Sequence, residues 1–127
     1  MARPLVPSLV KVRSIEAGAI FFVNETTMEQ AEEFVDEFFE GEGYRLEKGE
    51  LGDGRYGKGN PILRLILGAF YPRYAFSVAI DEGKGGNLEV MIVRAETGYA
   101  GGLIGRSQVL TEEKRIINEF RSVLEDR

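Results

Sequence analysis

Apolar and polar residues alternate along several stretches of the chain, which predicts strands with one buried face. Residues 9–15 read LVKVRSI, and the apolar run 18–23 follows at once. These two stretches predict either one long bent strand or two strands that meet near Ala17. Residues 44–51 alternate again, and a short strand over 55–58 would complete a hairpin with them.

The clearest hairpin is expected over residues 73–95, with a glycine-rich turn at 81–87. Its two strands each have one apolar face: Tyr74, Phe76, Val78 and Ile80 on the first, and Leu88, Val90 and Ile92 on the second. This pattern is typical of antiparallel strands that pack one face on a core.

Two segments have helical spacing. The first follows a capping box of Thr26 and Glu29 and ends at Gly41 and Gly43. The second is expected to begin near Ser107 or Thr111. Their apolar positions are Ala31, Phe34, Val35, Phe38 and Phe39 in the first, and Ile116, Ile117, Phe120, Val123 and Leu124 in the second.

A further helix is expected over residues 61–71, with Asn60 as its N-cap and Pro61 at its first position. This run is almost wholly apolar, so a buried strand is an open alternative.

Together these elements predict a single α+β domain over residues 1–127. We expect a two-layer structure in which helices cover one face of an antiparallel sheet of about four to six strands. The expected order is β(β)-α-β-β-α-β-β-α. The predicted core consists of Phe34, Phe38, Phe76, Val78, Val90, Ile92, Ile117 and Phe120.

Composition narrows the chemistry. The chain of 127 residues has no His, Cys or Trp and a net charge of −5. Disulfides and thiolate zinc sites are excluded, and the commonest general base is missing. We therefore expect no cofactor, no metal and no nucleic acid as a partner, and we lean against an enzyme. Because the start MARPLVPSLV lacks a signal peptide's apolar core and no run could span a bilayer, we expect a cytoplasmic location.

Residues 52–58 read GDGRYGK and are one residue short of a P-loop signature. A P-loop needs Ser or Thr after the lysine to hold Mg²⁺, but Gly59 follows Lys58. The preceding stretch is half polar, whereas a P-loop strand is buried in a parallel sheet. We interpret the motif as a glycine-rich turn and predict that the chain does not bind ATP or GTP in this way.

The charge distribution suggests where an anionic ligand would bind. Residues 25–54 hold eleven acids and two bases, whereas residues 55–80 hold four bases and no acid. A second glycine-rich stretch, 98–107, precedes the last helix and is interpreted as a loop, with an anion site at the helix start as the alternative. The candidate ligand-binding residues are Arg55, Tyr56, Lys58, Arg64, Arg73, Gly101, Gly102 and Arg106.

The apolar stretch Leu65–Tyr74 needs a cover, because a helix that is apolar all round is normally buried. We expect a symmetric homodimer through this stretch.

The chain resembles a group of short, uncharacterised bacterial proteins over roughly residues 44 to 105. The shared pattern is YGKG(N/S), then LLGAF, then GGxIG, which here corresponds to Tyr56–Gly59, Leu65–Phe70 and Gly101–Gly105. The resemblance implies a bacterial source and no particular activity.

Two function classes follow. The first is a non-enzymatic binding or self-associating module. The alternative is a pocket protein that binds a small apolar or anionic ligand between sheet and helices, as in a helix-grip domain.

Overall fold

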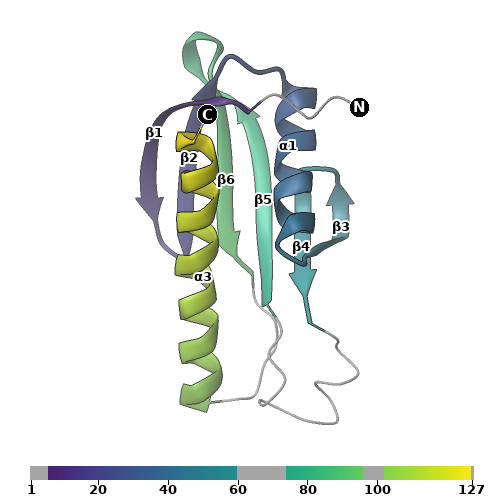
Figure 1. Cartoon of the computed structure of the whole chain (residues 1–127), viewed down its shortest axis with the longest axis vertical. Helices are drawn as coiled ribbons and strands as arrows, with labels where there is room; N and C mark the ends of the chain where they lie inside the picture. Colours follow the sequence, from purple (N-terminus) through teal and green to yellow (C-terminus); the bar gives the residue numbers. More distant parts are fainter. Residues whose placement is uncertain (1–5, 60–73, 96–101, 127) are drawn as a thin grey trace.

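The computed structural model of the chain describes residues 6–59, 74–95 and 102–126. Within them, six strands form one antiparallel sheet in the order β1-β2-β6-β5-β4-β3, and two α-helices lie on one face of it (Figure 1). The elements in chain order are β1 (Ser8–Ile15), β2 (Gly18–Asn24), α1 (Met28–Gly41), β3 (Arg45–Glu50), β4 (Asp53–Lys58), β5 (Tyr74–Glu82), the short 3₁₀ helix η2 (Lys84–Gly86), β6 (Leu88–Arg94) and α3 (Gly102–Glu125).

The α+β class and the two-layer arrangement agree with the prediction. The described order is β-β-α-β-β-β-β-α, so the expected order is not reproduced in full. The helix expected over residues 61–71 lies outside the described residues, as does most of the segment Leu65–Tyr74. Tyr74 itself begins β5, is half-buried and packs against the core.

Of the two alternatives that the sequence left open for the N-terminal stretch, the structure shows two strands. β1 and β2 pair antiparallel, and the turn between them places Ala17 in the left-handed region at φ 66°. Gly18 starts β2 where the backbone of β6 passes very close. A Cβ on Gly18 would lie 1.9 Å from the carbonyl oxygen of Ile92, so only glycine fits there.

The capping box of α1 lies one residue later than expected. Thr27, not Thr26, is the N-cap: its hydroxyl accepts from the backbone N–H of Gln30 at 3.1 Å. The Gln30 side chain accepts in return from the backbone N–H of Thr27, also at 3.1 Å. Thr27 and Gln30 thus satisfy two helix-end donors reciprocally, the role that the sequence had assigned to Thr26 and Glu29.

The near P-loop stretch is a β-turn followed by a strand, as expected. Residues 45–50 and 53–58 pair as the hairpin of β3 and β4. Gly52, in the turn between them, has φ 67°, and a Cβ there would lie 2.6 Å from the backbone of Glu32 in α1. This glycine therefore serves close packing of the turn on the helix.

Helix α3 begins at Gly102, earlier than the predicted start at Ser107 or Thr111. Part of the second glycine-rich stretch is therefore helix and not loop. Glycine inside a helix costs only about 1 kcal/mol relative to alanine, and the 24-residue helix that packs over the sheet can absorb that cost.

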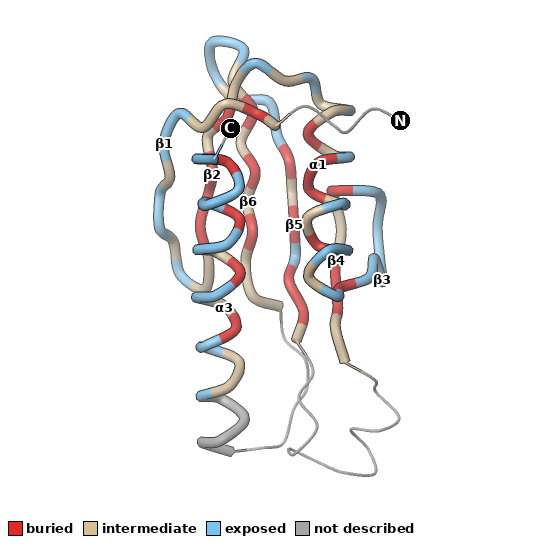
Figure 2. Tube along the Cα trace, viewed as in Figure 1, coloured by how far each residue is buried: buried red, intermediate tan, exposed pale blue. Residues whose placement is uncertain are grey.

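The core lies between the helices and the sheet, and Figure 2 shows its buried positions along the central strands and on both helices. Phe120 of α3 lies at its centre, with ring centroids 4.8 Å from Phe21, 5.8 Å from Phe34 and 5.0 Å from Phe38. All eight predicted core residues belong to this cluster. Six are buried, and Phe38 and Ile117 are partly buried and pack against the cluster.

The opposite face of the sheet has no helix on it among the described residues. The register of β1 and β2 places Leu9 and Val12 on the helix side, because they pair with the buried Val23 and Phe21. Lys11 and Arg13 therefore point to the open side, as expected from alternation. Val10 lies at a register shift between Leu9 and Lys11, and its side chain is 48% exposed.

We predict that Phe120→Ala lowers the free energy of unfolding by about 3–5 kcal/mol, because it leaves a cavity among three other rings. Urea unfolding measures the loss. Val123→Ala is the matched control on the same helix: Val123 is 37% exposed, and its truncation should cost less than about 1 kcal/mol. Equal urea midpoints for Phe120→Ala and wild type would contradict the assigned core.

Candidate functional site

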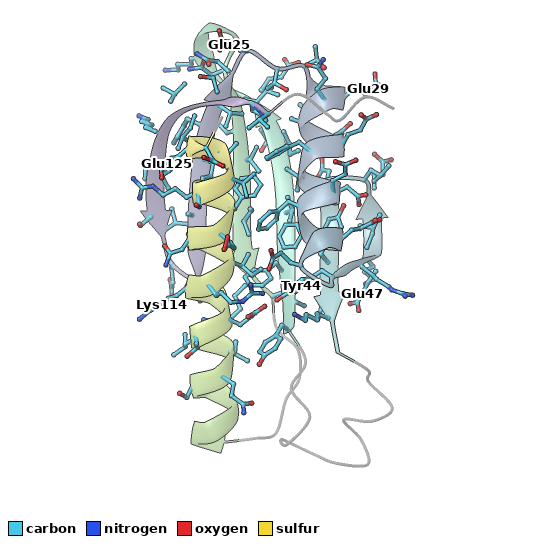
Figure 3. All side chains as sticks on the ribbon, in the orientation of Figure 1. Glu25, Glu29, Tyr44, Glu47, Lys114 and Glu125 are labelled. Atoms are coloured by element: carbon cyan, nitrogen blue, oxygen red, sulfur yellow. The ribbon has the colours of Figure 1, made fainter. Side chains whose placement is uncertain are left out.

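A groove of about 460 Å³ runs along the edge of the sheet between β1 and the C-terminal part of α3. Its lining residues are Ser8, Leu9, Val10, Lys11 and Val12 from β1 and Arg121, Leu124 and Glu125 from α3. Figure 3 shows Glu125 on the side of α3 that lies next to β1. The groove is open to solvent along its length.

The floor and the rim of the groove differ in chemistry. Leu124 is buried and Leu9 and Val12 are partly buried, so the floor is apolar and continuous with the core. On the α3 rim, Arg121 donates to Glu125 at 3.3 Å, one helical turn away. Arg121 and Glu125 thus pair with each other, and together with Ser8 and Lys11 they make most of the exposed lining of the groove polar above the apolar floor.

The strand that borders this groove is an edge of the sheet. Among the described residues, β1 has a neighbouring strand on one side only, which is β2. Lys11 places its ammonium 4.7 Å from the ring centroid of Phe22 on the open face, and Arg13 is exposed. An edge strand presents a row of backbone donors and acceptors to solvent.

A second cluster, which we call the Glu112 cluster, joins α3 to the end of α1 and the start of β3. Its members are Glu42, Tyr44, Glu112 and Arg115. The Tyr44 hydroxyl donates to Glu112 at 2.5 Å, and Arg115 donates to the same carboxylate through Nε at 2.8 Å and Nη2 at 2.9 Å. Arg115 also donates to Glu42 at 2.5 Å. Figure 3 shows Tyr44 in the space between the two helices.

Electrostatics in the Glu112 cluster favour the ionised carboxylate. Burial alone would raise the pKa of Glu112, but the hydrogen bonds from Arg115 and Tyr44 outweigh it and lower the pKa below its ordinary value. Burial and the bond to Glu112 raise the pKa of Tyr44, so the phenol stays protonated and donates. Hydrogen bonds to Glu112 and Glu42 raise the pKa of Arg115.

The role of the Glu112 cluster is structural. The buried carboxylate of Glu112 is saturated by the hydroxyl of Tyr44 and the guanidinium of Arg115. Among the described residues, no buried side-chain nitrogen or oxygen lacks a hydrogen-bond partner. These hydrogen bonds tie α3 to the residues that follow α1, and they satisfy the buried carboxylate of Glu112.

Two of the sequence-predicted ligand residues serve the fold. Tyr56 is fully buried; its hydroxyl donates to Asp36 at 2.6 Å and accepts from the backbone N–H of Gly52 at 2.8 Å. Lys58 donates to the carbonyl oxygen of Glu42 at 3.1 Å, and its ammonium lies 5.5 Å from the ring centroid of Tyr44.

The other predicted residues do not gather at one place within the described chain. Arg55 lies on β4 with its Nε 3.9 Å from Glu47. Gly102 is the first residue of α3, and Arg106 belongs to the same helix. Arg64, Arg73 and Gly101 lie outside the described residues.

Helix α1 carries a dense set of carboxylates, a charge run that is usually a solvated face. In the part of the chain that the structure describes, no group of three or more carboxylates is placed to hold a metal ion. Partial burial, with Asp53, Glu50 and Glu29 nearby, raises the pKa of Glu32. This carboxylate crowding fits an exposed acidic surface.

Comparisons with protein-family models, curated proteins and solved structures found no match. The resemblance to short bacterial proteins therefore stays a prediction. In the described part of the chain, none of the helices combines the length and the apolar character that crossing a membrane requires.

Sequence reasoning did not identify the groove or the Glu112 cluster. One signal was present for the cluster: Glu112 lies four residues before Ile116, on the same helical stripe as Phe120 and Leu124. A charged residue on a buried stripe needs a partner inside the protein. The groove had no comparable signal, because it depends on how far α3 lies from β1.

We predict that Glu112→Gln lowers the free energy of unfolding at pH 7 by about 1–3 kcal/mol, because the charge-assisted bonds are lost. The pKa of Glu112 is lower in the folded protein than in the unfolded chain. Its stabilisation is therefore complete above the unfolded-state pKa and disappears as the pH falls through the folded-state pKa. Urea titrations from pH 7 down to pH 3 should show that the free energies of unfolding of wild type and Glu112→Gln become equal at the lowest pH.

The control for this series is Glu119→Gln, which neutralises an exposed carboxylate on the same helix. It should change stability by less than about 0.5 kcal/mol. If the difference in free energy of unfolding between wild type and Glu112→Gln stayed constant over the whole pH range, it would contradict an ionised Glu112 in the cluster.

Proposed function

We propose that this protein is a non-enzymatic protein-binding module that accepts an extended segment of a partner as an additional strand beside β1. The observation that carries the proposal is the groove of about 460 Å³ between an edge strand and a helix. Strand addition at a sheet edge is an established way of binding peptides: main-chain hydrogen bonds supply affinity and a neighbouring pocket supplies selectivity.

The backbone of β1 supports the first half of this mechanism. Its outer edge has no strand neighbour in the described chain, so an incoming segment can pair with it at the usual spacing of about 4.8 Å. Each net main-chain hydrogen bond contributes about 0.5–1.5 kcal/mol. Several such bonds over the eight residues of β1 suffice for a weak, reversible interaction.

The groove supports the second half. Alternate side chains of an added strand would point to the helix side of the sheet, where Leu9, Val12 and Leu124 form an apolar floor. A volume of about 460 Å³ is within the range of ligand sites in proteins and has room for two or three medium-sized side chains. Apolar residues at every second position of the partner fit this floor.

The small-ligand alternative has weaker support. A helix-grip protein would hold its ligand between sheet and helices, but in the described residues that space contains packed aromatic rings. Phe39 stacks on Tyr56 at 4.9 Å and contacts Phe76 at 6.0 Å, and Phe120 fills the region beside them. The groove lies at the edge of the sheet, outside this ring cluster.

The expected homodimer through Leu65–Tyr74 and the cytoplasmic location stay predictions.

Binding of a fluorescein-labelled octapeptide that alternates Val and Gln tests strand addition. We expect wild type to bind it, measured by fluorescence anisotropy, and to bind the same peptide N-methylated throughout at least about tenfold more weakly, because N-methylation removes the backbone donors. Equal binding of both peptides would contradict main-chain pairing.

Two substitutions locate the binding edge. Val10→Asp places a charge on an exposed groove residue of β1 and should weaken binding of the Val/Gln peptide by about three- to tenfold, since apolar contact area is lost. Leu46→Asp is the matched control, because Leu46 is an exposed aliphatic residue, at 36%, on the opposite edge strand β3. A larger effect of Leu46→Asp would move the site to the other edge.

A further inference from the structure

The open-face side of β1 carries positive charge. Lys11 and Arg13 lie two residues apart on this face, both exposed, and β1 from Ser8 to Ile15 contains no acid. The protein as a whole has a net charge of −5, so this edge has the opposite sign to the molecule. In the Lys11 row of the sheet, the first acid is Glu89 on β6, two strands away across Phe22.

A strand added beside β1 would bring its own side chains opposite these cations. Residues directly opposite in neighbouring antiparallel strands have Cβ atoms about 4.5–5.5 Å apart, and opposite charges at such positions attract. The two faces of the added strand therefore meet different surroundings. One face meets the apolar floor of the groove, and the other meets Lys11 and Arg13.

We infer that the partner segment is an extended peptide that alternates apolar and acidic residues, with two carboxylates spaced two residues apart facing Lys11 and Arg13. This inference rests on the proposed strand addition and specifies the partner of that same site. The apolar residues occupy the groove beside Leu124, and the carboxylates lie on the open face.

The same cations disfavour a second copy of this strand as the occupant. If β1 paired with β1 of another molecule, Lys11 and Arg13 of both copies would face each other on one side of the joined sheet. Like charges at opposed positions are destabilising, and charged residues on edge strands limit self-pairing in this way. The edge thus selects an acidic strand from a different protein over itself.

The test compares two labelled octapeptides, one alternating Val and Glu and the other alternating Val and Gln, at low salt. Each pair of opposite charges on neighbouring strands increases the affinity by a modest factor. Wild type should therefore bind the Glu peptide about 2- to 30-fold more tightly than the Gln peptide. Raising the salt concentration should reduce this preference, because both cations are exposed.

Charge reversal identifies the residues responsible. Lys11→Glu combined with Arg13→Glu should abolish or invert the preference for the Glu peptide, measured as the ratio of the two dissociation constants within the same variant. Lys48→Glu is the matched control, since Lys48 is an exposed cation on the opposite edge strand β3. It should keep the wild-type preference.

The outcomes separate this inference from the proposed function. If wild type binds both peptides equally, strand addition stands and the acidic partner is overturned. If wild type binds neither peptide, strand addition fails and the acidic partner fails with it. A preference for Glu that persists in the double reversal, or that disappears in Lys48→Glu, would assign the charge recognition to another surface and overturn the inference.

Discussion

The packing of Phe120 on Phe21 determines where α3 lies on the sheet. The position of α3 in turn determines whether a groove is left beside the edge strand β1. The two rings meet edge to face, with centroids 4.8 Å apart, and they fix the helix over β2. Because β2 is the second strand of the sheet, the edge strand β1 extends beyond the helix. The groove is the space left between that strand and the helix surface.

One buried stripe of α3 contributes to the core, to the Glu112 cluster and to the floor of the groove. Glu112, Ile116, Phe120 and Leu124 follow each other at intervals of four residues and are all buried. Glu112 at one end is held by Tyr44 and Arg115, and Leu124 at the other end contributes to the groove floor. The Glu112 cluster holds the middle of α3, and Phe120 and Leu124 pack its C-terminal half on the core.

Much of the fold followed from local patterns. The hairpin of β5 and β6 and the helix α1 have strong periodicity and clear turn residues, and both were placed correctly to within a few residues. The predicted start of α3 was wrong, because the glycines Gly102 and Gly105 resemble a loop in the sequence although the helix begins at Gly102. The position of Thr27 as N-cap could not be separated from Thr26, since both can cap a helix.

The site was less accessible to sequence reasoning. Cations and glycine-rich stretches predicted a ligand site that included Tyr56 and Lys58. The structure places these two residues in hydrogen bonds that hold β4 to α1 and to Glu42, which follows α1. In the sequence, Lys11 and Arg13 are only the polar positions of an alternating strand. Their importance depends on the position of β1 at the edge of the sheet. The strand order determines that position, and no local sequence pattern predicts it. Sheet order depends on long-range contacts, as does the space between a helix and a strand.

Hydrogen exchange of the β1 amides, followed by NMR with and without the Val/Glu peptide, tests the central claim most directly. The outward-pointing amides between Ser8 and Ile15 should exchange quickly in the free protein and more slowly with the peptide bound, because they become paired. The amides of β3, the other edge, should not change. Unchanged exchange along β1 at saturating peptide, or slowed exchange on β3 instead, would contradict the account.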